Sequence, residues 1–100
     1  MNLNSNKNPK ITIITVVKNN EKYLEENIKS LINQTYQNYE HIIVDGLSTD
    51  KTMDIITKYK NKIHKIISER DNGLYDAINK GIQNASGDII GILNSDDYFY

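Results

Sequence analysis

The stretch ITIITVV, residues 11–17, decides the fold of this chain. Its β-branched side chains follow one another without a clean polar–apolar alternation. That pattern is typical of a strand that is buried on both faces of a parallel sheet. Working outward along the chain, three further short apolar runs occupy residues 41–44, 63–68 and 89–93. We expect each run to form a strand of the same sheet.

Apolar residues at helical spacing fill each interval between these runs. The first predicted helix is capped by the asparagine pair at 19–20 and continues to Gln34. Ser48 or Thr49 is placed to cap the second helix, and Gly87 is expected to stop the third. This alternation predicts an α/β fold with right-handed crossovers, a Rossmann-like three-layer α/β/α arrangement around a mainly parallel four-stranded sheet.

Composition excludes several classes of protein. Twelve Lys and Arg stand against thirteen Asp and Glu, a formal net charge of −1, so the chain has no basic field for nucleic acid or for an anionic membrane. Without cysteine there is no disulfide, thiolate nucleophile or cysteine-ligated zinc. No apolar run is long enough to span a bilayer, and Met1–Lys10 lacks the apolar segment of a secretory signal. We interpret residues 1–9 as a disordered lead-in to a cytoplasmic domain that occupies residues 10–100.

Polar residues gather where the predicted strands end, and ligands bind at that edge of an open parallel sheet. Asp96 and Asp97 follow the fourth run, and adjacent carboxylates are hard oxygen ligands for Mg²⁺ or Mn²⁺, although a solvated turn also accounts for them. Asp45 follows the second run, where it either caps a turn or accepts hydrogen bonds from a base or a ribose. His41 and His64 have no second candidate ligand near them in sequence, so we interpret them as surface or core side chains.

The turn after the first strand argues against several nucleotide-binding and phosphoryl-transfer sites. Residues 17–21 contain no glycine, whereas a dinucleotide site needs Gly-x-Gly-x-x-Gly there, and the chain has no Walker A sequence. A phospho-acceptor receiver domain, or a phosphatase that forms an aspartyl-phosphate, needs its acidic pair at this turn, which offers only Glu21. An unrelated phosphoryl-transfer domain that uses Asp96 and Asp97 stays open.

Four segments together resemble the N-terminal, nucleotide-binding half of a family 2 glycosyltransferase with the GT-A fold. The segments are ITIITVVKNN at 11–20 with Tyr23-Leu24, SLINQTY at 30–36 leading to IVDGLSTD at 43–50, DNGLYDAINKG at 71–81, and ASGD at 85–88 with ILNSDD at 92–97. The resemblance covers roughly residues 10–100, in the order and spacing of the family.

The resemblance implies a site for a nucleotide diphosphate sugar, most often a UDP-sugar. The loop around Thr15, Val17 and Asn19 is expected to face the uracil and ribose, Asp45 to bond the base, and Asp71 to border the nucleotide. Asn94-Ser95-Asp96 resembles the Asp-x-Asp motif, with Asp96 as the expected ligand of Mn²⁺ or Mg²⁺ and Asp97 beside it. The sequence departs from that motif at Asn94, whose amide can bond a ribose hydroxyl but brings no charge to the cation.

The activity that the resemblance implies is transfer of the sugar to an acceptor hydroxyl with inversion, as in bacterial surface-polysaccharide synthesis. In such enzymes the catalytic base and the acceptor site, for a glycan or a lipid-linked sugar, come later in the chain. We therefore expect these 100 residues to be a domain truncated at its C-terminus, which binds the donor without turnover. The full protein is expected in the cytoplasm or at the inner face of the plasma membrane. The apolar end at Tyr98–Tyr100 is expected to favour self-association. The alternative function is a non-catalytic nucleotide- or sugar-binding module.

Overall fold

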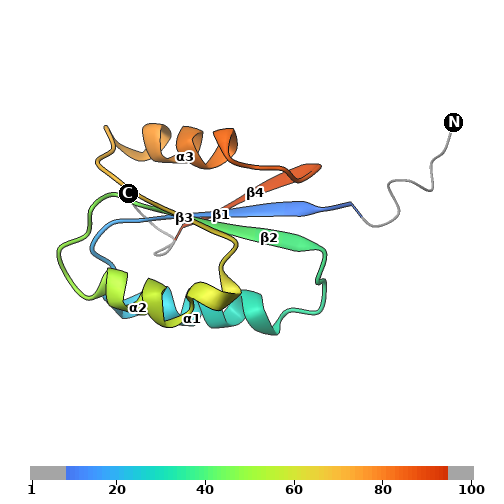
Figure 1. Ribbon diagram of the computed structural model, residues 1–100, viewed down its shortest axis with the longest axis horizontal. Helices are drawn as coiled ribbons and strands as arrows, with labels where there is room; N and C mark the ends of the chain where they lie inside the picture. Colours follow the sequence, from blue (N-terminus) through green and yellow to red (C-terminus); the bar gives the residue numbers. More distant parts are fainter. Residues whose placement is uncertain (1–8, 95–100) are drawn as a thin grey trace, which may run out of the picture.

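Four parallel strands form one sheet, which the computed structural model describes together with its helices over residues 9–94. The strands are β1 (Ile11–Val17), β2 (Tyr39–Asp45), β3 (Lys65–Ser68) and β4 (Ile89–Asn94), in the spatial order β3-β2-β1-β4. Three α-helices alternate with them, α1 (Glu21–Asn33), α2 (Thr52–Lys58) and α3 (Leu74–Gln83), and a short 3₁₀ turn, η2 (Lys60–Lys62), precedes β3. Helices α1 and α2 cover one face of the sheet and α3 covers the other (Figure 1). The predicted three-layer α/β/α fold is confirmed, and every strand pair is parallel.

The two sheet faces carry two separate apolar cores. On the face of α1 and α2, Val17 and Ile43 pack with Leu24, Ile28 and Ile56. On the face of α3, alternate residues of the same strands pack against Ala77; they are Ile14, Val16, Ile42 and Val44. Strands β1 and β2 are therefore buried on both sides, which explains why their sequences lack alternation.

Two glycines let the backbone of the α3 region approach β1 closely. A Cβ atom on Gly81 would lie 2.5 Å from Cγ2 of Ile14, so only glycine fits where α3 crosses β1. A Cβ atom on Gly87 would lie 2.5 Å from Oγ1 of Thr12, and the Gly87 N–H donates to that oxygen at 2.8 Å. Gly87 was predicted to end the helix, but α3 ends at Gln83 with Asn84 as its C-cap. The physical reason for Gly87 is this close approach.

Two more local predictions are wrong. The helix α2 begins at Thr52, and neither Ser48 nor Thr49 caps it. Instead, the Thr52 N–H donates to Oδ1 of Asp50 at 2.9 Å, while Ser48 and Thr49 bond to other parts of the same edge. The third strand was predicted from residue 63 but begins at Lys65, because Ile63 ends the 3₁₀ turn with its side chain in the α1–α2 core.

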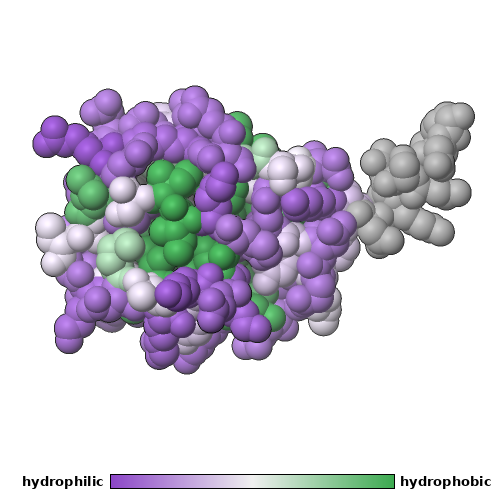
Figure 2. Space-filling model, viewed as in Figure 1, coloured by the Kyte–Doolittle hydropathy of each residue, from purple (hydrophilic) through white to green (hydrophobic). Residues whose placement is uncertain are grey.

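Apolar surface remains at the sheet edges. The outer strands β3 and β4 expose Ile66, Ile89, Ile90 and Ile92 to 37–50%. In the view of Figure 2, apolar atoms lie between the two helical layers. Over the described residues, no helix is both long and apolar enough to cross a membrane. The predictions for residues 1–8 and for Tyr98–Tyr100 lie outside the described residues.

His41 is a buried core residue on the α1–α2 face. Its side chain is 1% exposed, its Nε2 lies 2.8 Å from the Thr15 hydroxyl, and its backbone N–H donates to Nδ1 of His64 at 2.9 Å. Burial, with a smaller contribution from the charge of His64, lowers the pKa of His41 from 6.5 to about 4. The folded chain therefore holds His41 neutral at pH values where the unfolded chain binds a proton.

Acidification is expected to destabilise the fold through His41. This loss is absent above pH 6.5, grows as the pH falls from 6.5 to about 4, and levels off below, because only the unfolded state gains the proton in that window. The full effect is on the order of 3 kcal/mol. Urea unfolding followed by circular dichroism between pH 7 and 4.5 measures it. His41→Gln should flatten this dependence, and His64→Gln should keep most of it. A His41→Gln variant with the wild-type slope would contradict the assignment.

Candidate functional site at the carboxyl ends of the strands

The carboxyl ends of the strands bring the predicted site residues to one edge of the sheet. In the strand register, Val17 of β1 pairs with Asp45 of β2, and Val16 pairs with Asn94, the last residue of β4. Strands β2 and β4 thus flank β1 and end within one residue of each other. The loops after β1, β2 and β3 gather at this edge, on the left of Figure 1.

Asp45 is fully buried and organises the loop that follows β2. Its Oδ1 accepts from the Ser48 hydroxyl at 2.5 Å. Its Oδ2 accepts from the Ser48 N–H at 3.2 Å and from the Ser68 hydroxyl, at the end of β3, at 2.8 Å. Three donors satisfy most of the hydrogen-bonding capacity of this carboxylate, so its direct role is to hold the loop against β3.

Asp71 has a carboxylate oxygen with no donor. Its Oδ1 accepts from the Gly73 N–H at 3.1 Å, but its Oδ2 is buried and has no hydrogen-bond partner among the described residues. A Cβ atom on Gly46 would lie only 2.6 Å from that Oδ2 and 3.5 Å from Cδ of Lys18. The absence of a side chain at Gly46 therefore makes room for the Asp71 carboxylate beside Asp45. An unpaired buried carboxylate oxygen is costly, and a bound donor would relieve that cost.

Lys80 holds the loop that carries Asp71. Its Nζ lies 3.2 Å from Oε1 of Glu69 and 3.4 Å from Oδ2 of Asp76, and it donates to the Arg70 carbonyl at 2.5 Å. Asp76 in turn accepts from the Asn72 N–H at 2.9 Å. One lysine on α3 thus fixes three backbone or side-chain points around Asp71.

Asn19 joins the loops after β1 and β2. Its Oδ1 accepts from the N–H of Thr49 at 2.7 Å and of Asp50 at 3.3 Å, and its own N–H donates to the Ser48 hydroxyl at 2.8 Å. It has a positive φ of 51°, a conformation that asparagine tolerates. Asn19 was predicted to face the nucleotide. In the structure its side-chain oxygen holds the loop after β2 against the loop after β1.

The other predicted binding and metal-ligating residues divide into three groups. Thr15 and Val17 are fully buried, Thr15 bonded to His41 and Val17 in the α1–α2 core, so their side chains are not presented at the edge. Asn94 is placed there by the register of β4. Ser95, Asp96 and Asp97 lie outside the described residues. Within residues 9–94 no cluster of three His, Cys, Asp or Glu residues could hold a metal ion.

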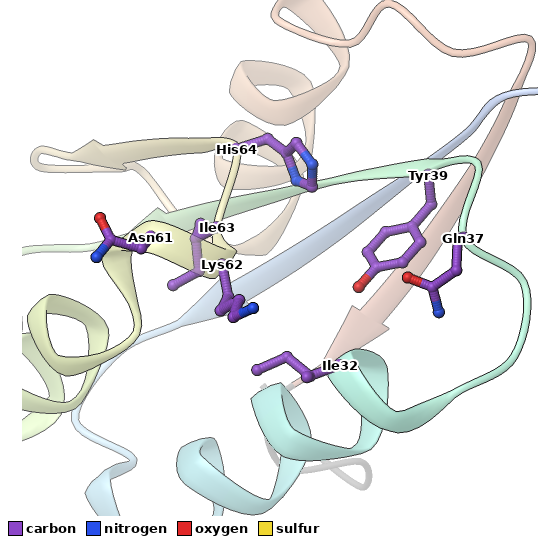
Figure 3. A pocket seen from close by; sticks show the side chains of 7 residues that line it. All are labelled: Ile32, Gln37, Tyr39, Asn61, Lys62, Ile63 and His64. Carbon is purple, nitrogen blue, oxygen red and sulfur yellow. The ribbon is translucent and has the colours of Figure 1, made fainter.

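A hollow of about 250 Å³ lies elsewhere, between the end of α1 and the starts of β2 and β3 (Figure 3). Ile32, Tyr39, Lys62 and His64 are among the residues that line it. Because Tyr39 begins β2 and His64 precedes β3, this hollow belongs to the amino edge of the sheet. It is separate from the edge that holds Asp45 and Asp71.

The family model for "Glycosyl transferase family 2" matches residues 12–100. The chain belongs to glycosyl transferase family 2. It is 35% identical over 96 residues to a putative teichuronic acid biosynthesis glycosyltransferase, TuaG, of Bacillus subtilis. That match covers 93% of this chain and 38% of TuaG. The chain therefore spans well under half of the length of this family 2 relative.

Solved structures of glycosyltransferases share this fold. TarS of S. aureus, solved as residues 1–349 in complex with UDP-GlcNAc, superposes with a TM-score of 0.81 at 32% identity, over 89% of this chain and 27% of that one. The mannosyltransferase PcManGT of Pyrobaculum calidifontis, solved with GDP-Man and Mn²⁺, superposes with a TM-score of 0.81 at 25% identity, over 88% of this chain and 28% of that one. The chain thus has the architecture of the GT-A glycosyltransferases, as the sequence predicted.

Sequence reasoning missed several residues of this family 2 site. The absence of a side chain at Gly46 leaves space for the Asp71 carboxylate, and the aliphatic part of Lys18 lies beside that space. The Ser68 hydroxyl donates to Asp45 in addition to that of Ser48. A glycine directly after the aspartate that ends a strand was an available signal for close approach at Gly46. Nothing in the sequence indicates that Ser68 reaches Asp45, because that contact depends on the pairing of β2 with β3.

Proposed function

We propose that this chain is the donor-binding part of a glycosyltransferase, which transfers a sugar from a UDP-sugar to an acceptor hydroxyl with inversion. The observation that carries the proposal is the meeting of Asp45 and Asp71 at the carboxyl edge, with a buried Asp71 oxygen that has no donor. Relatives bound to UDP-GlcNAc and to GDP-Man and Mn²⁺ support a nucleotide sugar as the ligand.

Among the described residues, Asp71 has a buried carboxylate oxygen at this edge that can accept a hydrogen bond from a ligand. Its Oδ2 accepts from nothing among residues 9–94, whereas the two oxygens of Asp45 already accept from Ser48 and Ser68. A base N–H or a ribose hydroxyl would supply the donor that Asp71 lacks. Asp45 would act mainly by holding the loop, because it is fully buried and three donors already occupy most of its acceptor capacity.

A divalent cation would bind to Asp96, with Asp97 beside it, just after β4. Oxygen donors of this type suit Mg²⁺ or Mn²⁺, and the strand that leads to them ends beside the end of β1. Bound there, the cation would stabilise the charge on the leaving diphosphate. The amide of Asn94 would bring no charge, so fewer carboxylates would coordinate the metal than in an Asp-x-Asp motif.

The rest of the reaction belongs to a longer protein. Inversion requires a general base for the acceptor hydroxyl, and we assign no such base within these 100 residues. We place the base and the site for a glycan or lipid-linked acceptor after Tyr100. We also propose a role in bacterial surface polysaccharide synthesis, which the name of TuaG supports. For the location we propose the cytoplasm or the inner face of the plasma membrane.

Removal of the Asp96 charge tests the metal-dependent part of this function. Asp96→Asn is expected to weaken UDP binding in Mn²⁺ by about tenfold or more, the effect of losing roughly 1.4 kcal/mol of ligand–metal interaction. Isothermal titration calorimetry with and without Mn²⁺ measures it. The matched control is Asp88→Asn, because Oδ2 of Asp88 accepts from the Lys10 N–H at the opposite edge.

Four results are informative. A loss confined to Asp96→Asn and to Mn²⁺-containing buffer supports the proposal. Equal losses in both variants would contradict the role of Asp96. UDP binding that ignores the metal would favour a non-catalytic binding module, and binding of UTP or phosphate without preference for a UDP-sugar would favour an unrelated phosphoryl-transfer domain.

A further inference from the structure

Leu47 adopts a backbone conformation that a branched apolar residue rarely takes. Its φ is 61°, and in the described part of the chain Asn19 is the other non-glycine residue with a positive φ. In this left-handed region Cβ crowds the following carbonyl oxygen, so glycine is the usual occupant and asparagine the usual exception. Leucine has neither the freedom of glycine nor a side chain that can bond its own backbone there.

Burial does not offset this strain. The Leu47 side chain is 51% exposed, and Leu47 belongs to neither apolar core. The neighbouring hydrogen bonds hold the conformation instead. The Ser48 N–H and hydroxyl donate to Asp45, and the Thr49 N–H donates to Asn19, so the turn is fixed on the C-terminal side of Leu47. Backbone strain that is not offset by burial of the side chain is typical of a functional position.

Leu47 is also placed at the candidate site. It directly follows Gly46, whose missing side chain makes room for the unpaired oxygen of Asp71, and it directly precedes Ser48, which bonds Asp45. The edge therefore combines a carboxylate oxygen without a donor among the described residues and the large, exposed apolar side chain of Leu47. Small-molecule sites combine apolar contact area with a few placed polar groups in this way.

We propose that Leu47 supplies the apolar contact for the nucleobase and so helps to determine nucleotide affinity. This inference rests on the proposed function. A nucleobase with its ribose has both features that the edge can recognise, a flat apolar face for Leu47 and N–H or O–H donors for Asp71. The phosphates offer neither feature and are not expected to contact Leu47.

Two substitutions at this position separate strain from contact. Leu47→Gly removes the contact and relieves the strain, so we expect a higher unfolding temperature together with a UDP affinity that is about threefold to tenfold lower. Leu47→Ala removes the contact but keeps the strain, so we expect a similar loss of affinity without the gain in stability. The diagnostic feature of Leu47→Gly is that stability rises while UDP affinity falls. Substitution of a purely structural residue would not weaken ligand binding while it stabilised the fold.

The measurement is calorimetric titration of the chain with UDP and, separately, with inorganic pyrophosphate, in the presence of Mn²⁺. Leu47→Ala should lower the affinity for UDP and leave that for pyrophosphate unchanged. Ile82→Ala is the matched control, since Ile82 is 42% exposed near the C-terminal end of α3, away from the carboxyl edge, and should affect neither ligand.

The outcomes separate this inference from the proposed function. If the wild-type chain binds no UDP, the proposed function fails and the inference fails with it. If the wild type binds UDP and both Leu47 variants bind it equally well, only the inference is overturned. Equal losses for UDP and pyrophosphate would also overturn it, since they would indicate a collapsed loop rather than a lost base contact.

Discussion

Gly81→Val will lower the free energy of unfolding by about 3 kcal/mol, the upper range for overpacking of a core. The reason is the contact between α3 and β1, where the new Cβ would lie 2.5 Å from Cγ2, 3.0 Å from Cδ1 and 3.2 Å from Cγ1 of Ile14. Both elements are fixed by their own packing, β1 by two strand neighbours and α3 by Ala77 in the core. Urea unfolding at pH 7, followed by circular dichroism, measures the change.

Two further variants identify the cause of that loss. Gln83→Val, on the exposed side of the same helix, carries the modest helix propensity of valine without the clash and should cost under about 1 kcal/mol. Ile14→Ala removes the atoms that the new side chain meets, so the double variant should be more stable than the sum of the single losses predicts. If Gly81→Val and Gln83→Val proved equally stable, the close crossing of α3 over β1 would be wrong.

Asp45→Ala is expected to remove both stability and nucleotide binding. The substitution leaves three donors without their acceptor, the Ser48 N–H and the hydroxyls of Ser48 and Ser68, at a fully buried position. We expect a loss of about 2 kcal/mol in the free energy of unfolding, because an unpaired buried polar group costs about 1–3 kcal/mol. The Ser48 donors are half-buried and carry most of this loss, since Ser68 is exposed and its hydroxyl can bond to water instead. Urea unfolding and UDP titration of the same sample provide the two readouts.

Ser68→Ala is the matched control for Asp45. It removes only one of the three hydrogen bonds, so it should cost about 1 kcal/mol and leave the Ser48 turn in place. UDP binding should persist in Ser68→Ala and be lost in Asp45→Ala. An Asp45→Ala variant that unfolded at the urea concentration of the wild type would show that the carboxylate does not hold the loop.

The sequence predicts the order of strands and helices because the elements differ strongly in hydrophobic pattern. The runs at 11–17 and 41–44 are apolar on both faces, and such runs form central strands of a parallel sheet. The boundaries are less predictable. The run from Ile63 to Ser68 is continuous in sequence, but Ile63 packs into the core from the 3₁₀ turn before the strand begins.

The sequence predicts the site only as a set of residues near the carboxyl edge of the sheet. Asp45 is a candidate because it follows an apolar run, and Asp71 follows from the family resemblance. Their different capacities depend on contacts with Ser48, Ser68 and Gly46. Thr15 and Val17 illustrate the limit. The lack of alternation predicts that both faces of β1 are buried, but the family resemblance placed these two residues at the nucleotide. Their own contacts, Thr15 with His41 and Val17 with the α1–α2 core, depend on the fold.

We propose that a nucleotide binds at the carboxyl edge, between the loops that carry Asp45 and Asp71. The most direct test is a set of ¹H–¹⁵N correlation spectra of the chain, titrated with UDP in the presence of Mg²⁺. We expect saturable shifts of the amides of residues 45–48 and 71–73, with no shifts at Ser86 or His64 on the amino edge. Saturable shifts confined to the amino edge, or to the residues that line the hollow beside Tyr39, would contradict the account.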